Sequence, residues 1–287
     1  MTDHQLVHDR YGKQRVHLTW LDRERDPHVV RQLALDVALE GDLAASYTEG
    51  DNRAVIATDS MKNTVYVLAR ERGVASLEGF AGLLAEHFVS TYGQVERATV
   101  CADELPWRPI RVAGAPHPHA FTGGCGMDTA TAVAARDGRT ELTSGLRDLR
   151  VLKSADSGFS DFVTDRFRTL ADTSDRLFAT SIAATWRRGR DAAGDDASFP
   201  AERAAVRDAL LEAFARHRSL SVQHTLYAMA SAALDAAPSV HEISLVLPNQ
   251  HHLLVDLEPF GLDNPNRVFV ATSEPFGCIE GTVRRGG

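Results

Sequence analysis

Two short polar segments near the N-terminus hold residues suited to proton transfer. Tyr11–Lys13 precedes a run of alternating apolar residues, and Thr58-Asp59 lies between two apolar runs. A lysine before a strand is ordinarily solvated, but burial and nearby cations lower its pKa and make it a base. The Thr58 hydroxyl can relay a proton, because it donates one hydrogen bond and accepts two, or it can cap its own turn.

Phe159 and Arg176 could bind a flat anion. An aromatic ring stacks on a heterocycle, and a planar guanidinium bonds two carbonyl oxygens at once. Taken singly, a phenylalanine is more often core and an arginine more often surface. Ser221-Val222-Gln223 opens an expected helix, whose first N–H groups bind carbonyl oxygens and anions. Gln223 would add a donor and an acceptor, although an ordinary helix start is the alternative.

The segment 247–252, LPNQHH, is expected to be a loop between two strands. Adjacent histidines point to opposite sides of an extended chain, so His251 and His252 are not expected to share a metal ion. His251 could carry a proton, and Asn249 could donate an amide N–H to a bound small molecule. We find no zinc spacing, HExxH, P-loop, GxSxG or dinucleotide fingerprint, so a flavin or nicotinamide enzyme of the Rossmann type is disfavoured.

Composition narrows the class of protein. The formal net charge of −8 disfavours nucleic-acid binding, which needs a basic stripe. No stretch has the roughly 20 apolar residues of a membrane span, and the N-terminus has no signal-peptide core. The 3 cysteines are far apart and give no disulfide framework. The terminal TVRRGG is not the Ser-Lys-Leu peroxisomal address. We expect a cytoplasmic protein, of bacterial type.

The elements that must position these residues alternate between two periodicities. Alternation at 16–20 and 33–39, and β-branched residues at 63–69, predict three strands. Helical spacing marks 76–91, 200–216 and 221–236. The remaining expected strands are 146–151, 177–186, 242–247, 252–257 and 267–271, with a charged loop at 187–199. Segment 106–145 is the least regular, with strands expected around a glycine-rich turn.

Each half of the chain therefore shows strands, a helical region and strands again. This order predicts an α+β fold of two tandem units, each an antiparallel sheet with helices on one face. We place the units at 1–140 and 141–287. Sequence identity between the halves is not evident, so the repeat rests on the order of elements.

Taken together, the motifs resemble those of the urate oxidase (uricase) family. They match in order and approximate spacing over nearly the whole chain, and the resemblance is weak only from about 95 to 145. Two positions depart from the usual family motifs: Ser60 stands where threonine is common, and Gln250 where lysine is common. The matching segments are YGK at 11–13, ATDSMKNTVYVLAR at 57–70, LKSADSGFSDF at 152–162, DRLFATSIAATW at 175–186, SVQHTLYAM at 221–229, LPNQHHLLVDL at 247–257 and EPFGCIEGTV at 274–283.

The resemblance implies cofactor-free oxidation of urate by O2 to 5-hydroxyisourate, with release of hydrogen peroxide, in purine degradation. It also implies the tunnel-forming T-fold, with two units per chain that assemble into a tunnel-shaped barrel. The usual assembly is a homotetramer with its active sites at subunit interfaces.

The same resemblance implies roles for individual residues. Lys13, Thr58 and His251 would be catalytic, with Thr58 and Asp59 reaching into the adjoining subunit's site. The substrate-binding residues would be Thr58, Asp59, Phe159, Arg176, Val222, Gln223 and Asn249. Two alternatives stay open: another T-fold enzyme acting on purines or pterins, which usually needs zinc, and a purine-binding protein without catalysis.

Overall fold

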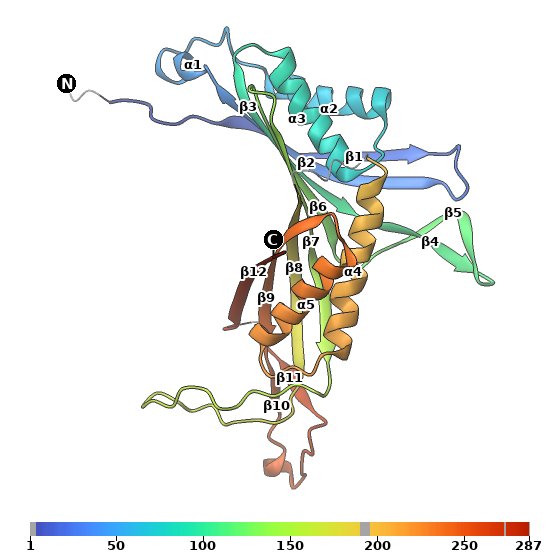
Figure 1. Cartoon of the computed structure of the whole chain (residues 1–287), viewed down its shortest axis with the longest axis vertical. Helices are drawn as coiled ribbons and strands as arrows, with labels where there is room; N and C mark the ends of the chain where they lie inside the picture. The colour runs from blue at the N-terminus through green and yellow to red at the C-terminus, as the bar shows by residue number, and fades with distance from the viewer. Residues whose placement is uncertain (1–3, 190–195, 273, 287) are drawn as a thin grey trace. The chain divides into compact units, whose positions relative to one another are not determined.

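The computed structural model describes residues 4–189, 196–272 and 274–286 (Figure 1). The chain divides into two compact units. The first comprises Met1–Gly145 with Ala193–Pro200, and the second comprises Leu146–Ala192 with Ala201–Gly287. The boundary between them lies inside strand β7 (Thr140–Lys153). The division at 140/141 expected from the sequence stays a prediction.

The first unit is an antiparallel sheet whose helices pack on one face (Figure 1). Its strands are paired in the order β1 (Tyr11–Asp22), β2 (Val29–Gly41), β3 (Val95–Leu105) and β6 (Met127–Ala135). Between β2 and β3 lie α1 (Ala44–Thr48), α2 (Thr58–Arg72) and α3 (Leu77–Thr91), and between β3 and β6 lies the hairpin β4 (Trp107–Val112) and β5 (Ala115–Gly123). Helix α3 packs on β3 and β6, and α2 packs on β1.

The second unit repeats this arrangement. Strands β8 (Phe178–Arg188), β9 (Val240–Gln250) and β12 (Gly277–Arg284) are paired in that order. Helix α5 (Val222–Ala236), which follows α4 (Ser198–Arg216), packs on β9 and β12. A small sheet of β10 (His252–Leu254) and β11 (Phe269–Ala271) flanks the short 3₁₀ helix η1 (Glu258–Phe260). The tandem α+β prediction is confirmed.

The core of the first unit follows the predicted periodicities. Leu33, Leu35, Val37 and Leu39, which alternate along β2, are each at most 1% exposed. The helical stripe expected in 76–91 is buried in α3, and α4 and α5 form where helical spacing predicts them. Burial of the apolar faces of β2 and α3 is the main source of stability for these two elements.

The strand predicted at 63–69 is wrong, because this segment lies inside helix α2. Its buried residues Met61, Val65 and Leu68 follow helical spacing rather than alternation. Of the β-branched residues that favour a strand, Val67 is exposed, Thr64 is half-buried and Val65 belongs to the buried helical stripe, so strand propensity is a weak guide here. Thr58 is thus the first residue of a helix, and the acidic Asp59 lies in its first turn, where a negative charge is favourable.

Several strand limits also differ from expectation. β9 continues to Gln250, so the expected loop at 247–252 is largely wrong, and β10 ends at Leu254 instead of residue 257. β11 begins at Phe269, two residues later than expected. Strand β12 was not predicted. Of the charged loop expected at 187–199, residues 190–195 lie outside the described residues, and α4 begins at Ser198.

One repeated feature is an arginine that caps a helix at its C-terminal end. Arg136, just after β6, donates hydrogen bonds to the carbonyl oxygens of Val89, Tyr92 and Val95. Arg285, just after β12, does the same at the end of α5, where its acceptors are Leu234, Ala237 and Val240. Each acceptor in the second unit stands 145 positions after its counterpart. The two units are therefore equivalent at the level of single residues.

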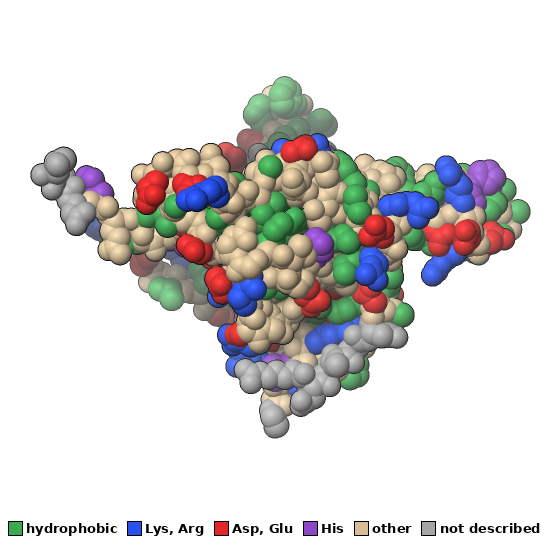
Figure 2. Space-filling view, turned by 90° about the horizontal axis from the view of Figure 1, so that it is seen from above, with side chains coloured by type: hydrophobic (Ala, Val, Ile, Leu, Met, Phe, Trp, Pro, Cys, Tyr) green, Lys and Arg blue, Asp and Glu red, His purple; other side chains and the backbone are tan. Residues whose placement is uncertain are grey.

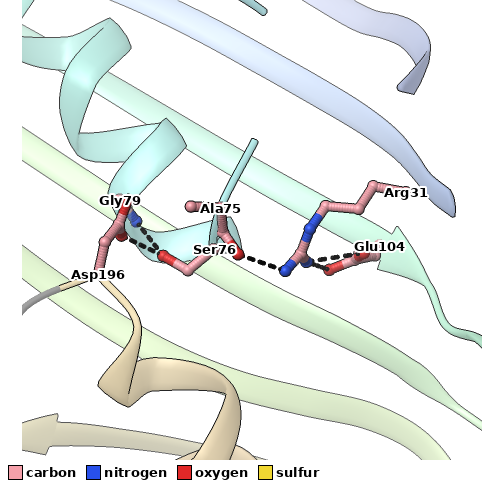
Figure 3. Close-up of polar contacts among 6 residues, drawn as sticks. All are labelled: Arg31, Ala75, Ser76, Gly79, Glu104 and Asp196. Atoms are coloured by element: carbon pink, nitrogen blue, oxygen red, sulfur yellow. Dashed lines mark hydrogen bonds and ion pairs between the residues drawn. The ribbon is translucent and has the colours of Figure 1, made fainter. Parts of the chain in front are cut away.

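The helix starts are equivalent at the same offset. Ser76 caps α3 by accepting from the Gly79 amide at 2.9 Å, and Ser221 caps α5 by accepting from the His224 amide at 3.1 Å. In the first unit the Ser76 hydroxyl also donates to Asp196 (Figure 3).

The turn before α3 is fixed from its other side by an arginine of β2. Arg31 bonds both carboxylate oxygens of Glu104, at 3.0 and 2.9 Å, and also the carbonyl oxygen of Ala75 (Figure 3). Arg31 Nη1 makes both bonds to the carboxylate, which leaves Nη2 to donate to Ala75. The N-terminal end of α3 is thus held by polar contacts to β2 and β3.

The charged surface is mixed in sign on the face shown in Figure 2. Acidic and basic side chains lie interspersed there, without a continuous basic stripe among the described residues of that face. Among the described residues, no helix is both long and apolar enough to cross a membrane. The same residues contain no group of three or more His, Cys, Asp or Glu side chains arranged to hold a metal ion.

Candidate active site

The start of β1 is fastened to the segment that leads into α2. The Tyr11 hydroxyl donates to the Ile56 carbonyl at 3.1 Å and accepts from the Ile56 amide at 2.9 Å. A side chain at Gly12 would meet the Val37 carbonyl, because its Cβ would lie 1.8 Å from that oxygen. These contacts bring the backbone beside Lys13 close to the residues just before Thr58.

Lys13 lies at an irregular point of β1. It pairs with Val37 of β2, and the register then shifts before Val16. Within this β-bulge Arg15 adopts a left-handed backbone, with φ of 57°, and its amide donates to the Asp36 carboxylate at 2.6 Å. Bulges re-aim neighbouring side chains and often lie beside active sites. Lys13 is half-buried.

Thr58 and Asp59 begin α2 on the same side of the unit as Lys13. Thr58 is half-buried, whereas Asp59 is exposed and accepts from Lys62 Nζ at 2.6 Å and from Asn63 Nδ2 at 3.0 Å. The hydrogen bond and charge of Lys62 lower the pKa of Asp59, and the charge of Lys13 adds to this. Asp59 is therefore within electrostatic reach of Lys13. The three predicted site residues of the first unit thus lie on two elements that Tyr11 and Ile56 join.

Phe159 and Arg176 lie together in the second unit. The backbone of Phe159 is paired with Thr173 by two hydrogen bonds, at 2.8 and 3.0 Å. The centre of the Arg176 guanidinium lies 5.2 Å from the centroid of the Phe159 ring, in cation–π range. Phe162 stacks on Phe159 with centroids 4.6 Å apart and planes 10° from parallel. A flat ligand would therefore meet an aromatic pair with a cation beside it.

Arg176 has an unusual environment for a cation. Its Nε is buried and has no hydrogen-bond partner among the described residues, and burial lowers the pKa of the guanidinium. A desolvated guanidinium without an anionic partner is costly unless an anion or a set of acceptors joins it. This side chain is suited to the oxygens of a bound anion.

The first turn of α5 lies next to this pair. The segment around Ser157 runs parallel to Ser219, with the Gly158 amide donating to the Ser219 carbonyl at 2.8 Å. The Arg176 amide in turn donates to the Ser157 carbonyl at 2.7 Å. Val222 is buried and Gln223 is exposed. Their amides fall among the first N–H groups of the helix, which have no partner within it.

Asn249 lies near the end of β9, and His251 directly follows that strand. Asn249 is half-buried and lies between Thr180 of β8 and Gly277 of β12. Because β8 begins just after Arg176, this pairing connects Asn249 to the pair of Phe159 and Arg176. His251 is half-buried, and its carbonyl accepts from the Thr272 amide at 2.9 Å. The predicted residues therefore form two groups, one in each unit.

Sequence reasoning did not single out three hydroxyl residues that support these groups. Tyr11 fastens β1, and the buried hydroxyls of Ser157 and Thr180 lie near Arg176 and Asn249. Each stands inside a motif already quoted from the sequence. Only the structure shows which partner a hydroxyl has, or that it has none among the described residues.

The tandem antiparallel α+β units place the chain in the T-fold class. The chain belongs to the uricase family, since the model of that family matches residues 9–124 and 142–280. The unmatched stretch between them lies within 95–145, where the motif resemblance is weak. Membership makes the chain an oxidoreductase that acts on urate.

Individual relatives agree with this assignment. The chain is 40% identical to the uricase of Arthrobacter globiformis, over 98% of this chain and 90% of the relative. It is 37% identical to the uricase of Danio rerio, over 98% of this chain and 95% of the relative. The crystal structure of the A. globiformis uricase has a TM-score of 0.91 at 39% identity, covering 100% of this chain and 96% of that one. A uricase from Bacillus fastidious has a TM-score of 0.84 at 26% identity, covering 96% and 93%.

Proposed function

We propose that this enzyme oxidises urate with O2 and water to 5-hydroxyisourate and hydrogen peroxide, without a metal or organic cofactor. Urate gives up two electrons, O2 takes them with two protons, and water supplies the hydroxyl at C5. One observation supports this function above the others: the half-buried Arg176 lies beside the Phe159 ring, and its buried Nε has no hydrogen-bond partner among the described residues.

The second unit supplies the binding half of the proposed site. Phe159 stacks on the purine, and Arg176 bonds the urate oxygens as a charged donor. The first turn of α5 adds the Val222 amide and the Gln223 side chain, which together match the donor and acceptor edge of a purine. Holding urate in one orientation beside O2 removes much of the entropic barrier to reaction.

Proton transfer belongs to Lys13, Thr58 and His251. Lys13 takes a proton from urate through the Thr58 hydroxyl, which suits the relay because it both donates and accepts. Electron-rich, deprotonated urate can then transfer single electrons to O2 directly. His251 completes the proton network, and the Asn249 amide faces the oxygen or water above the ring.

A complete site needs both groups, and we propose that it forms between subunits of a homotetramer. Thr58 and Asp59, at the start of α2, would reach the binding group of a neighbouring chain. β1 is an edge of the first unit's sheet and β12 an edge of the second, and sheet edges have unpaired backbone groups. Pairing of these edges between chains would give the tunnel-shaped barrel. We place the enzyme in the cytoplasm.

Urate consumption tests the function directly. Urate absorbance is followed in excess chelator with no added cofactor, while peroxide is measured in parallel. We expect one peroxide per urate consumed. Binding of urate without consumption would favour a binding protein, and activity that required zinc would favour another T-fold enzyme.

Lys13→Met tests the proton-transfer half. Removal of a general base typically lowers turnover about 10²–10⁴-fold. We expect a fall in kcat of that order while a urate analogue binds with nearly unchanged Kd. Lys13→Arg is the matched control, because it keeps the positive charge but stays protonated. Full activity in Lys13→Arg would show that Lys13 supplies charge and not a base.

A further inference from the structure

Of the buried polar atoms of the second unit that lack a hydrogen-bond partner within the described part of the chain, three belong to the motifs at 152–162 and 175–186. They are Arg176 Nε, Ser157 Oγ and Thr180 Oγ1. Buried polar atoms are bonded in the great majority of cases, so each exception needs a reason. Arg176 and Ser157 are joined through their backbones beside the proposed urate pocket. Thr180 is different, because it lies inside a regular strand.

Thr180 occupies the buried face of β8, together with Phe178 and Ile182, and is 0% exposed. Its partner across the antiparallel pair is Asn249 of β9. Residues directly opposite in such a pair point to the same face, with Cβ atoms about 4.5–5.5 Å apart. The Thr180 hydroxyl and the Asn249 carboxamide are thus neighbours, and rotation of the Asn249 side chain can close a hydrogen bond between them.

We propose that Thr180 is a positioning residue that orients Asn249 for the oxidation of urate, an inference that rests on the proposed function. Its hydroxyl donates to Asn249 Oδ1, which turns the amide N–H groups toward the substrate and oxygen. A carboxamide has nearly the same shape in either orientation, so a neighbouring donor must select one. Gly277, on the other flank of Asn249, has no side chain that could do so.

Stability distinguishes a positioning role from a structural one. Loss of the single hydrogen bond to Asn249 has a modest cost in stability. Valine has the shape of threonine and is well suited to a buried strand position, which offsets part of that cost. Thr180→Val is therefore expected to lower the Tm by no more than about 6 °C, so that the variant stays folded and a loss of turnover has no origin in unfolding.

The experiment combines single and double variants in the full-length assembled enzyme. We expect Thr180→Val to lower kcat about tenfold, with KM for urate within about twofold of wild type, and Thr180→Ser to restore kcat. In an Asn249→Ala background, Thr180→Val should have no further effect, because the hydroxyl acts only through the amide. Thr185→Val, on the exposed face of the same strand, should leave kcat unchanged.

Each other outcome overturns the inference. Wild-type kcat in Thr180→Val, or an equal loss of kcat in the Asn249→Ala background, would show that Thr180 does not act through Asn249. A fall in Tm of more than about 6 °C, or loss of folding, in Thr180→Val would show that the hydroxyl holds the fold instead. An inactive wild type would overturn the proposed function as well, whereas an active wild type beside an unaffected Thr180→Val would overturn this inference alone.

Discussion

Tyr11→Phe tests whether one hydroxyl holds together the two elements that carry Lys13 and Thr58. The change deletes two hydrogen bonds to Ile56, of 3.1 and 2.9 Å. A typical bond contributes about 0.5–1.5 kcal/mol net, so the expected loss is about 1–3 kcal/mol. Ile56 is only 6% exposed, so its N–H and C=O groups would be left buried and unpaired. That favours the upper half of the range.

Thermal unfolding at a fixed protein concentration measures the loss of stability, since assembly makes Tm depend on concentration. A domain of 150–250 residues shifts by about 2–4 °C per kcal/mol, so a loss of about 2 kcal/mol lowers Tm by roughly 4–8 °C. Burial raises the pKa of Tyr11, so its hydroxyl stays protonated across the neutral range. Turnover should fall as well, because the segment before Thr58 is no longer fixed relative to Lys13.

Tyr66→Phe is the matched control, because the Tyr66 side chain is 41% exposed on α2. This substitution should shift Tm by no more than about 1–2 °C. A Tyr11→Phe variant with wild-type Tm would refute the reasoning, because the two hydrogen bonds would then contribute nothing. A lower Tm with unchanged kcat would keep the structural role of Tyr11 and remove its role in placing Thr58.

The remaining predictions concern the second unit. Arg176→Ala should raise KM for urate at least about tenfold, because it removes a charge-assisted donor, and steady-state kinetics with an unchanged KM would exclude Arg176 from the site. His217 has a pKa lowered by burial and by the charges of His224 and Lys153. The unfolded chain therefore binds a proton more readily, and stability should fall as pH drops through about 6.5 toward the lower folded pKa. His217→Gln should flatten Tm between pH 7 and 5, and an equal slope in this variant would assign the acid sensitivity to other groups.

The elements that the sequence predicts correctly have strong apolar contrast. In β2 each buried leucine or valine is flanked by less buried neighbours, and α3 has a continuous apolar stripe. The strand prediction at 63–69 fails because its β-branched residues favour a strand, whereas its buried residues follow helical spacing. Tertiary packing decides such cases, because Met61, Val65 and Leu68 can be buried together only on a helix. Strand β12 has no fully buried residue and two glycines, so its alternation is too weak to detect.

For the candidate site, residue type and spacing suggested chemistry, but the resemblance assigned the roles. Lys13 and Thr58 are 45 positions apart, and no local pattern predicts that Tyr11 joins their elements. The same holds for Arg176 and the start of α5, which meet through backbone pairing at Ser157. Long-range pairing depends on the fold and cannot be deduced from either segment alone.

The two units differ in the side chains around one helix start, at a position where their scaffolds agree. Ser76 and Ser221 cap equivalent helices, and Arg136 and Arg285 close the opposite ends. At the start of α3, however, the Asp196 carboxylate bonds Ser76, and it lies so close to Gly79 that an added Cβ would come within 1.6 Å. A carboxylate of the chain itself thus occupies the anion-favouring end of this helix.

At the start of α5 the corresponding turn instead carries the exposed side chain of Gln223, with Arg176 nearby. This difference supports the proposal that the second unit binds the purine. It also accounts for the weak sequence signal of the repeat. The two units are equivalent at a few capping residues, whereas the residues around each helix start differ between the units.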